Sequence, residues 1–380
     1  MFENLINFIR SLYPDRVSIP LHEPAFIGNE KKYLIDCIDS TYVSSVGAYV
    51  DRFELMIAQF TGAKYAIATV NGTSALHAAL KLSKVDEGDE VITQPLSFVA
   101  TCNAINYCGA KPVFIDVDLE TLGMSPDALE VFLKENSAIR NGICYNKNTD
   151  AKISAVVPMH TFGHPCRIDK ILEVCKKYNI SVVEDAAESL GSYYKGQHTG
   201  TFGRFGVLSF NGNKTITTGG GGVILTNDEN MARKAKHITT TAKVPHAYEY
   251  IHDMIGYNYR LPNLNAALGC AQMENIELIL EKKRELANLY IQNLSKFNVR
   301  VFTEPKYSQS NYWLNTVVLD DEISKEVLLA ETNKSGVMMR PIWRLLSSLN
   351  MFEKCQRGNL DNSISLQKRL VNLPSSVRIS

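Results

Sequence analysis

Short apolar runs alternate with helical patterns between about residue 60 and residue 226. The runs YAIATV (65–70) and KISAVVPM (152–159) have the length and the β-branched content of buried strands. The segment NGTSALHAALKL (71–82), which follows the first run, has the spacing of a helix. Apolar strands that alternate with helices indicate a mostly parallel sheet with helices on both faces. The pattern therefore predicts the α/β fold class.

Further strands and helices continue this alternation. We expect strands over residues 90–95, 111–117, 180–186, 206–210 and 222–226, and helices over residues 97–109, 126–135 and 168–178. In such sheets, ligands bind beyond the carboxyl ends of the strands. Five strands are followed at that end by polar or aromatic residues, namely Asn71-Gly72-Thr73, Pro95 to Phe98, His160, Glu184-Asp185 and Ser209. These residues predict a binding site along one edge of the sheet.

The two ends of the chain differ from this central part. Apolar residues at helical spacing predict an N-terminal helix over residues 1–15, which packs on the protein or on a partner subunit, or lies on a membrane surface. Its polar face is poor in Lys and Arg, which favours packing. One long helical pattern covers residues 263–297, and an expected strand and helix follow it. We therefore expect a large domain over residues 16–260 and a small α+β domain over residues 261–380, attached by a long connecting helix.

Composition narrows the classes of function. Lys and Arg number 40 and Asp and Glu number 40, a balance that argues against a general nucleic-acid-binding protein. No apolar run approaches the roughly 18–20 residues of a membrane helix, and the N-terminus does not resemble a secretion signal. We therefore expect a cytoplasmic protein that does not bind membranes. Its eight cysteines are scattered without a C-x-x-C pair, which is typical of free thiols.

Three features indicate the chemistry of the site. Asn71 to Ser74 begin a helix, where free N–H groups bind anions, although an ordinary helix cap uses the same residue types. Asp185 ends a buried strand without a basic neighbour in sequence, so a ligand cation is one solution to its charge. Lys214 follows the strand GVLSF, which carries Ser209, and a lysine confined there can act as a nucleophilic amine, whereas most loop lysines are simply solvated. The three features in this order are more specific than any one alone.

Four consecutive glycines, Gly219 to Gly222, come after this lysine. They are compatible with a flexible linker, a phosphate loop or a tight return of the chain. Because the lysine precedes them closely and an apolar strand follows directly, both ends are fixed, and we expect a tight return that positions Lys214. On this interpretation, Gly220→Val should weaken cofactor retention or folding.

The stretch VVEDAAESLGSYYKGQHTGTFGRFGVLSFNGNKTITTGGGGVI, at residues 182–224, resembles the core signature of the nucleotide-sugar aminotransferases. The blocks NGTSAL, SFVATCNAI, PMHTFGHPC and GYNYRLPNLNAALG resemble further parts of the same family. The resemblance runs from about residue 18 to the C-terminal NLPSS. It implies a pyridoxal-phosphate enzyme with the fold of aspartate aminotransferase, which is fold type I.

The same resemblance implies roles for residues around the ring of pyridoxal phosphate. Lys214 would bind the cofactor covalently and then carry a proton between the cofactor and the substrate carbon. Asp185 would pair with the pyridinium nitrogen, and Phe98 would pack on the ring face. Glu188 falls where the family often has Gln near the ring hydroxyl, and a carboxylate in this position would repel the phenolate.

Other implied roles concern the phosphate, the subunits and the substrate. Gly72, Thr73 and Ser209 would bind the phosphate, and Asn258 would reach the phosphate in the neighbouring subunit, which implies a homodimer with shared sites. Residues near the sugar nucleotide would come from several segments, namely Ser44, Ser45, His160, Lys243, His252 and Arg260. The residues Lys243, His252 and Arg260 are equally typical of an exposed surface.

The glycine run also bears on the substrate. Many relatives have TTGEGG where this chain has TTGGGG, and STYVSSVG and KVPHAYEYIHD resemble the branch that acts on UDP-4-keto-6-deoxy-N-acetylhexosamines. We expect transfer of an amino group from glutamate to the C4 keto group of such a sugar, for a bacterial surface polysaccharide or glycan. The alternative is an enzyme of the GDP-perosamine synthase type. A sugar dehydratase, which has histidine in place of the lysine, and a non-catalytic homologue fit less well.

A metal site is a competing interpretation of one segment. His160 and His164 have the spacing of metal ligands on a helix, with Cys166 and Asp169 nearby. The glycine and the proline on either side of His164 argue against a helix there. We therefore expect no metal.

Overall fold

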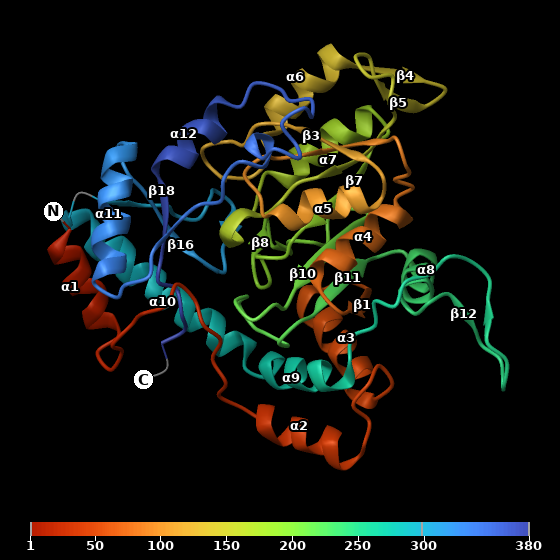
Figure 1. Cartoon of the computed structure of the whole chain (residues 1–380), viewed down its shortest axis with the longest axis horizontal. Helices are drawn as coiled ribbons and strands as arrows, with labels where there is room; N and C mark the ends of the chain where they lie inside the picture. The colour runs from red at the N-terminus through yellow and green to blue at the C-terminus, as the bar shows by residue number, and fades with distance from the viewer. Residues whose placement is uncertain (1, 298, 379–380) are drawn as a thin grey trace.

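A seven-stranded sheet forms the centre of the large domain (Figure 1). The computed structural model describes residues 2–297 and 299–378. The strands are arranged in the order β1, β11, β10, β7, β6, β2, β3, and only β11 runs against the others. Their bounds are β1 Tyr65–Thr69, β2 Glu90–Thr93, β3 Lys111–Phe114, β6 Ile153–Val157, β7 Ser181–Asp185, β10 Phe205–Ser209 and β11 Gly222–Thr226. The predicted α/β fold with a mostly parallel sheet is confirmed.

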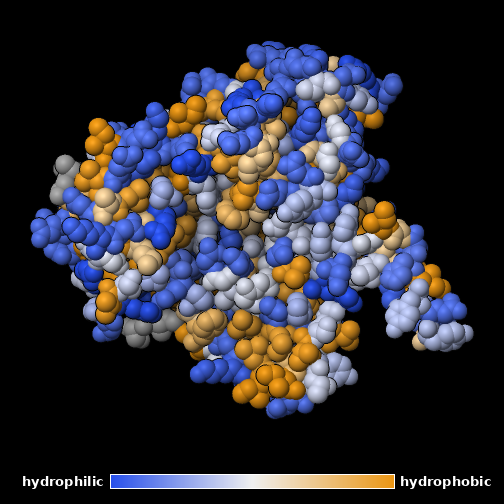
Figure 2. All heavy atoms as spheres, in the orientation of Figure 1, coloured by the Kyte–Doolittle hydropathy of each residue, from blue (hydrophilic) through white to orange (hydrophobic). Residues whose placement is uncertain are grey.

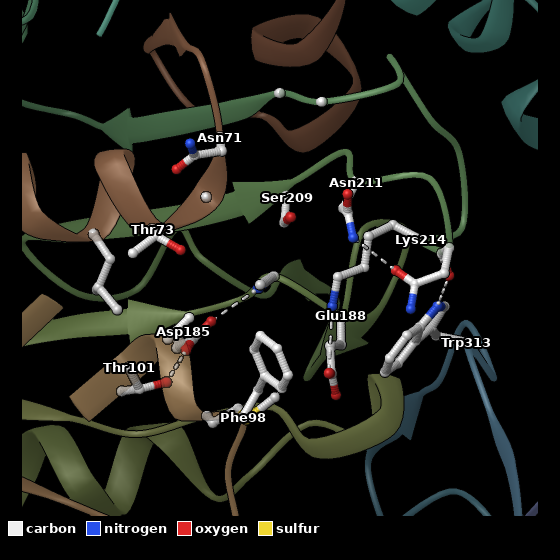
Figure 3. A pocket seen from close by; sticks show the side chains of 18 of the residues that line it. Asn71, Thr73, Phe98, Thr101, Asp185, Glu188, Ser209, Asn211, Lys214 and Trp313 are labelled. Atoms are coloured by element: carbon white, nitrogen blue, oxygen red, sulfur yellow. Dashed lines mark hydrogen bonds and ion pairs between the residues drawn. The ribbon is translucent and has the colours of Figure 1, made fainter. Parts of the chain in front are cut away.

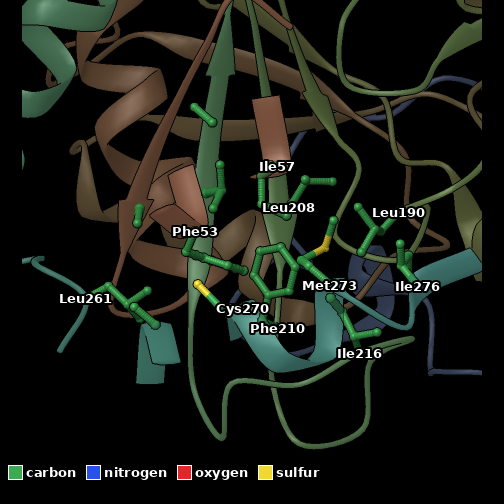
Figure 4. Packing of buried hydrophobic residues seen from close by; sticks show 14 of the residues in the cluster. Phe53, Ile57, Leu190, Leu208, Phe210, Ile216, Leu261, Cys270, Met273 and Ile276 are labelled. Carbon is green, nitrogen blue, oxygen red and sulfur yellow. The ribbon is translucent and has the colours of Figure 1, made fainter. Parts of the chain in front are cut away.

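Helices cover both faces of this sheet because alternate residues of each strand point to opposite sides. Ile224 of β11 packs with one group of helices, whereas its neighbours Val223 and Leu225 pack with another. The first group comprises α4 Gly72–Leu82, α5 Val99–Tyr107 and α8 Glu229–Thr239. The opposite face is covered by α3 Ala48–Thr61, α6 Pro126–Asn136, α7 Ile168–Lys177 and α9 Asn263–Met273. Figure 4 shows the packing of Phe53 from α3 against Phe210 just after β10, with ring centroids 5.1 Å apart.

The small domain is built on a second, antiparallel sheet with the order β14, β16, β18, β17. Its strands are β14 Arg300–Val301, β16 Asn315–Val318, β17 Arg340–Pro341 and β18 Leu370–Leu373, and its helices are α11 Glu322–Lys334 and α12 Asp361–Arg369. The N-terminal helix α1, Glu3–Leu12, buries Leu5 and Ile9 in the core of this domain. The sequence pattern predicted packing for this helix, and the structure shows where it packs.

The helical pattern at residues 263–297 forms two helices and a short 3-10 turn instead of one long helix. Helix α9 ends at Met273, and α10 spans Ile276–Leu294, with the break at Glu274 and Asn275. Helix α9 packs in the core of the large domain, whereas α10 runs from there into the core of the small domain (Figure 1). The change from one core to the other falls inside α10, since Ile276 and Ile279 still pack in the first core and Leu286 and Tyr290 pack in the second.

Several elements were not predicted. Four of them are helices, namely α2 Glu30–Asp39, α3, α8 and α12. The others are short strands, namely β14, β17 and β18, the hairpin β4 Ser137–Arg140 with β5 Ile143–Asn146, the small sheet of β8 Tyr193–Tyr194, β9 Gln197–His198 and β15 Ser308–Gln309, and the hairpin β12 Lys243–Val244 with β13 Ile251–His252. The last hairpin projects from the body of the protein (Figure 1). All eight cysteines are free thiols, and within the described ranges no helix is long and apolar enough to span a bilayer.

Candidate active site

A cavity of about 290 Å³ opens at the carboxyl ends of the parallel strands (Figure 3). Asp185 ends β7, Ser209 ends β10, and Gly72 begins the helix after β1. The cavity is lined by all the residues that were expected around the cofactor within one subunit, namely Gly72, Thr73, Phe98, Asp185, Glu188, Ser209 and Lys214. Segments up to about 140 residues apart in sequence thus meet at one edge of the sheet, as strand-end sites do in this class.

One end of the cavity is an anion-binding cradle at the N-terminus of α4. Asn71 caps this helix, because its side-chain oxygen accepts a hydrogen bond of 2.8 Å from the backbone N–H of Ser74. A Cβ atom at Gly72 would lie 2.9 Å from Cβ of Ser209, so only glycine fits between helix and strand. Thr73 and Ser209 line the cavity here (Figure 3). Free N–H groups, the helix dipole and two hydroxyl groups suit a phosphate.

Asp185 presents a buried carboxylate to the cavity. Its Oδ2 accepts a hydrogen bond of 2.7 Å from Thr101, and its Oδ1 accepts one of 3.2 Å from the backbone N–H of Ala187. Across residues 2–297 and 299–378, no cationic side chain forms an ion pair with it. A buried carboxylate without a cation is costly unless a ligand supplies one. The position is therefore suited to a protonated ring nitrogen.

Lys214 extends into the cavity from the turn after β10. Its Nζ lies 3.3 Å from Oε1 of Glu188 and 4.1 Å from the ring centroid of Trp313 (Figure 3). The indole N–H of Trp313 donates a hydrogen bond of 2.6 Å to the carbonyl of Asn213, which fixes the ring beside the lysine. Burial raises the pKa of Glu188 to about 7, while the charge of Lys214 and the N–H of Phe162 act in the opposite direction. The protonation equilibrium of this carboxyl group is thereby shifted towards neutral pH.

Aromatic side chains form the wall of the cavity on the side of the small domain. Trp313 and Trp343, the chain's two tryptophans, both line it, and Trp343 lies 6.2 Å from Phe98 between ring centroids. Neither tryptophan was predicted from the sequence to line the site, and nor was Thr101. The rarity of tryptophan in this chain is the signal that could have found the first two, and the position of Thr101 three residues after Phe98 could have found the third.

The residues that were expected to meet the substrate or the second subunit lie elsewhere. They are Asn258, Ser44, Ser45, Lys243, His252 and Arg260, and none of them lines this cavity. Asn258 accepts a hydrogen bond of 2.9 Å from Arg260, and His252 donates one of 2.8 Å to the carbonyl of Thr241 on the projecting hairpin segment. Within a single chain these residues are therefore separate from Lys214, and a role for them in the site requires a second subunit.

His160 needs a correction, because it is fully buried below the cavity and does not line it. Its Nε2 lies 3.0 Å from Oε2 of Glu184, and its Nδ1 accepts a hydrogen bond from the backbone N–H of Cys166. Glu184 also accepts backbone hydrogen bonds from Gly200, Phe202 and Gly203. Both ring nitrogens of His160 take part in this network, so neither is free to form a hydrogen bond with the sugar. In the described ranges, no group of metal-binding side chains includes it.

The glycines of the run differ in how strictly the fold requires them. Gly219 has a positive φ of 78°, and a Cβ at Gly222 would lie 2.4 Å from the backbone of Asn71. A Cβ at Gly220, in contrast, would meet only the carbonyl of Val70 at 3.8 Å, an ordinary contact. The steric need for glycine therefore lies at the positions around Gly220, and the expected effect of Gly220→Val on cofactor retention stays a prediction, since Gly220 lines the cavity.

A phosphate cradle, an unpaired buried aspartate and a confined lysine fit pyridoxal phosphate as one ligand. A model of the DegT/DnrJ/EryC1/StrS aminotransferase family matches residues 25–380. The chain belongs to this family. Members of the family use pyridoxal phosphate, and the chain is accordingly a sugar aminotransferase that depends on this cofactor.

Relatives and solved structures of the family cover nearly the whole chain. The chain is 38% identical to the GDP-perosamine synthase of Escherichia coli O157:H7, over 95% of this chain and 94% of that protein. It is 40% identical to the putative pyridoxal phosphate-dependent aminotransferase EpsN of Bacillus subtilis strain 168, over 94% and 90%. Its fold is similar to that of the putative sugar aminotransferase Spr1654 from Streptococcus pneumoniae in its PLP form, with a TM-score of 0.85, 22% identity and coverage of 96% and 95%.

Proposed function

We propose that this chain transfers the amino group of glutamate to the C4 keto group of a GDP-linked 4-keto-6-deoxyhexose, in the manner of a GDP-perosamine synthase. The observation that carries this proposal is the similarity, along nearly the whole chain, to a relative named for that activity. The sequence resemblance put a UDP-4-keto-6-deoxy-N-acetylhexosamine first, and the relatives favour the GDP alternative. In either case the product would enter a bacterial surface polysaccharide or glycan.

The residues that line the cavity would have different roles, which their positions suggest. Bound pyridoxal phosphate supplies an electron sink for the carbon from which a proton is removed. Asp185 would hold the ring nitrogen protonated through its buried carboxylate, and the α4 cradle with Thr73 and Ser209 would hold the phosphate. Phe98 would contact the ring face. Lys214 would bind the cofactor through Nζ and move the proton at the reacting carbon.

A second subunit would complete the site. Asn258, Lys243 and His252 lie outside the cavity of their own chain, which is the arrangement expected if they serve the partner. Helix α2 and the segment after it expose apolar side chains on one face, including Ile35, Ile38, Val43 and Val46, and Figure 2 shows a broad apolar area over this part of the surface. An exposed apolar area of this kind is typical of an interface between subunits.

A panel of sugar nucleotides would test the substrate. We expect the purified enzyme, supplied with ¹⁵N-glutamate, to transfer the label to a GDP-4-keto-6-deoxyhexose, with the product identified by mass spectrometry. Transfer to the UDP-N-acetyl substrates alone would replace the GDP proposal with the UDP alternative. Lys214→Ala serves as the control, since transfer by this variant would contradict the role of the lysine.

Mixing two inactive variants would test the shared sites. Lys214→Ala and Asn258→Ala damage groups that, in a shared site, lie on different subunits. Equal mixing after subunit exchange should restore activity to about a quarter of the intact level, because half of the dimers are mixed and each has one intact site. A mixture that stays inactive would argue against Asn258 acting across the interface.

A further inference from the structure

Glu188 and Lys214 form an isolated pair of opposite charges inside the cavity. Nζ of Lys214 lies 3.3 Å from Oε1 of Glu188, and the side chains are 13% and 1% exposed. The other oxygen of Glu188, Oε2, accepts a hydrogen bond of 2.9 Å from the backbone N–H of Phe162, which leaves Oε1 directed at the lysine (Figure 3). In the part of the chain that the structure describes, no other carboxylate lies within ion-pair distance of Lys214.

We propose that Glu188 and Lys214 exchange one proton directly, so that Glu188 stores the proton whenever the amine of Lys214 has to be neutral. In the forward step the N–H bond of the ammonium breaks, its electron pair stays on Nζ, and an O–H bond forms at Oε1. The reverse step returns the proton. The pair is neutral in total before and after, and no further reactant is required.

The surroundings of the pair explain why a local store is useful. A lysine must be neutral to act as a nucleophile or as a base. Each change between the charged and the neutral form of this buried amine therefore requires that a proton leave or return. Direct exchange with solvent is hindered because both side chains are largely covered. The ring of Trp313 on the other side of Nζ can stabilise an ammonium but cannot accept a proton. Glu188 is the partner that can do so.

Burial, partly offset by the charge of Lys214, brings the ionisation of Glu188 near neutral pH. Burial is the main cause that raises its pKa, to about 7, and Asp185 contributes in the same direction. Lys214 and the N–H of Phe162 lower the pKa. A group that titrates near the working pH gives up and takes a proton with little cost in either direction. A protonated Glu188 is a hydrogen-bond donor towards the ring oxygen of the cofactor. The same property therefore removes the repulsion that is expected between a carboxylate and this oxygen.

The rate at which the apoenzyme captures pyridoxal phosphate, followed by visible absorbance across pH, tests the pair without any sugar nucleotide. Its outcome is therefore independent of the proposed substrate. Glu188→Gln keeps the shape and the hydrogen-bond acceptor but cannot store a proton. We expect the wild-type rate to change little between pH 7 and pH 9, and the variant rate to fall about tenfold per pH unit as the pH is lowered, because its proton must leave to solvent. Circular dichroism and full cofactor loading at high pH confirm that the variant is folded.

Two comparisons decide between proton storage and a structural role. Glu188→Asp, which retains a carboxyl group, should be slower than wild type at every pH but should keep the flat profile. If the capture rate of Glu188→Gln depended on pH in the same way as that of wild type, or were lower by the same factor at every pH, the proposal would be overturned. Infrared spectra of the apoenzyme provide the second readout. At pH 7, Lys214→Ala should gain a neutral carboxyl band that Lys214→Ala/Glu188→Gln lacks, and a Glu188 that stays ionised there would also overturn it.

Discussion

Thr101 donates a hydrogen bond of 2.7 Å from its Oγ1 to Oδ2 of Asp185, and both side chains are buried beside the cavity. Helix α5 supplies the threonine and strand β7 the aspartate, so this bond joins two elements that were expected separately. The bond fixes the carboxylate in the orientation in which its other contact, the N–H of Ala187, is also made. The orientation of Asp185 is thus set by the protein before any ligand binds.

Removal of this hydrogen bond should weaken cofactor binding. Thr101→Val keeps the volume but removes the donor, and a hydrogen bond to a charged group contributes roughly 1.5–3 kcal/mol. We expect the dissociation constant for pyridoxal phosphate to rise about tenfold or more, measured by equilibrium dialysis or absorbance titration. Thr101→Ser, which keeps the hydroxyl, should bind almost as tightly as wild type. If the valine variant bound equally well, Asp185 would not depend on Thr101 for its position.

An added methyl group at Gly72 should close the phosphate cradle. The Cβ of Gly72→Ala would lie 2.9 Å from Cβ of Ser209, so helix α4 and strand β10 must move apart. We expect weaker binding of both pyridoxal phosphate and inorganic phosphate, together with a loss of stability of roughly 1–3 kcal/mol. Ser209→Gly in the same chain removes the atom that clashes and should restore the melting temperature, while phosphate binding stays weak. An unchanged melting temperature in Gly72→Ala would show that no clash occurs.

The central sheet could be predicted because its strands are apolar throughout and are separated by helices of distinct period. The break between α9 and α10 could not, because apolar spacing continues through Glu274 and Asn275 and neither glycine nor proline stands there. The change from one core to the other does not mark the break either, because it falls later, inside α10. Short hairpins such as β12–β13 have few residues and no buried face of their own, and so they give no periodic signal.

The residues near Lys214 could likewise be predicted from the sequence only in part. Gly72, Asp185 and Lys214 stand at the ends of predicted strands, and the carboxyl-end rule places them together. Trp313 is separated by 100 residues from Asn213, to which its indole N–H is bonded, and it belongs to the other domain. Its position depends on how the two domains pack. His160 also stands at the end of a predicted strand, but its side chain is buried in contact with the carboxyl group of Glu184. The strand pattern alone does not predict this contact.

Two neighbouring glycines should respond in opposite ways to the same substitution. A Cβ at Gly222 would lie 2.4 Å from the backbone of Asn71, whereas a Cβ at Gly220 has an ordinary contact at 3.8 Å. We expect Gly222→Ala to lose roughly 1–3 kcal/mol in the free energy of unfolding. Gly220→Ala should stay within about 1 kcal/mol of wild type, since a methyl group at an unstrained position mainly restricts the unfolded chain. Denaturant unfolding measures both, and an equal loss in the two variants would show that the contacts of the added Cβ do not set the difference between the two positions.

The buried lysine of the connecting helix should make stability depend on alkaline pH. Lys283 is 1% exposed, and its Nζ lies 3.0 Å from Nε2 of His22 and donates to the carbonyl of Ser375 at 2.8 Å. Burial lowers the pKa of Lys283 from its ordinary value of 10.5 to about 7. Between these two pH values the unfolded chain therefore holds a proton that the folded chain does not.

The free energy of unfolding contributed by Lys283 should accordingly rise as the pH increases from about 7 towards 10, by up to ~1.4 kcal/mol per pH unit. Lys283→Met, which has a similar length and no charge, lacks this dependence. The difference in free energy of unfolding between wild type and Lys283→Met, measured in urea at several pH values, should therefore shift in favour of wild type as the pH is raised. A difference that is constant across this range would show that Lys283 keeps its proton in the folded protein. Its ammonium would then be stabilised by the imidazole of His22 and the carbonyl of Ser375, without a carboxylate partner among the residues described.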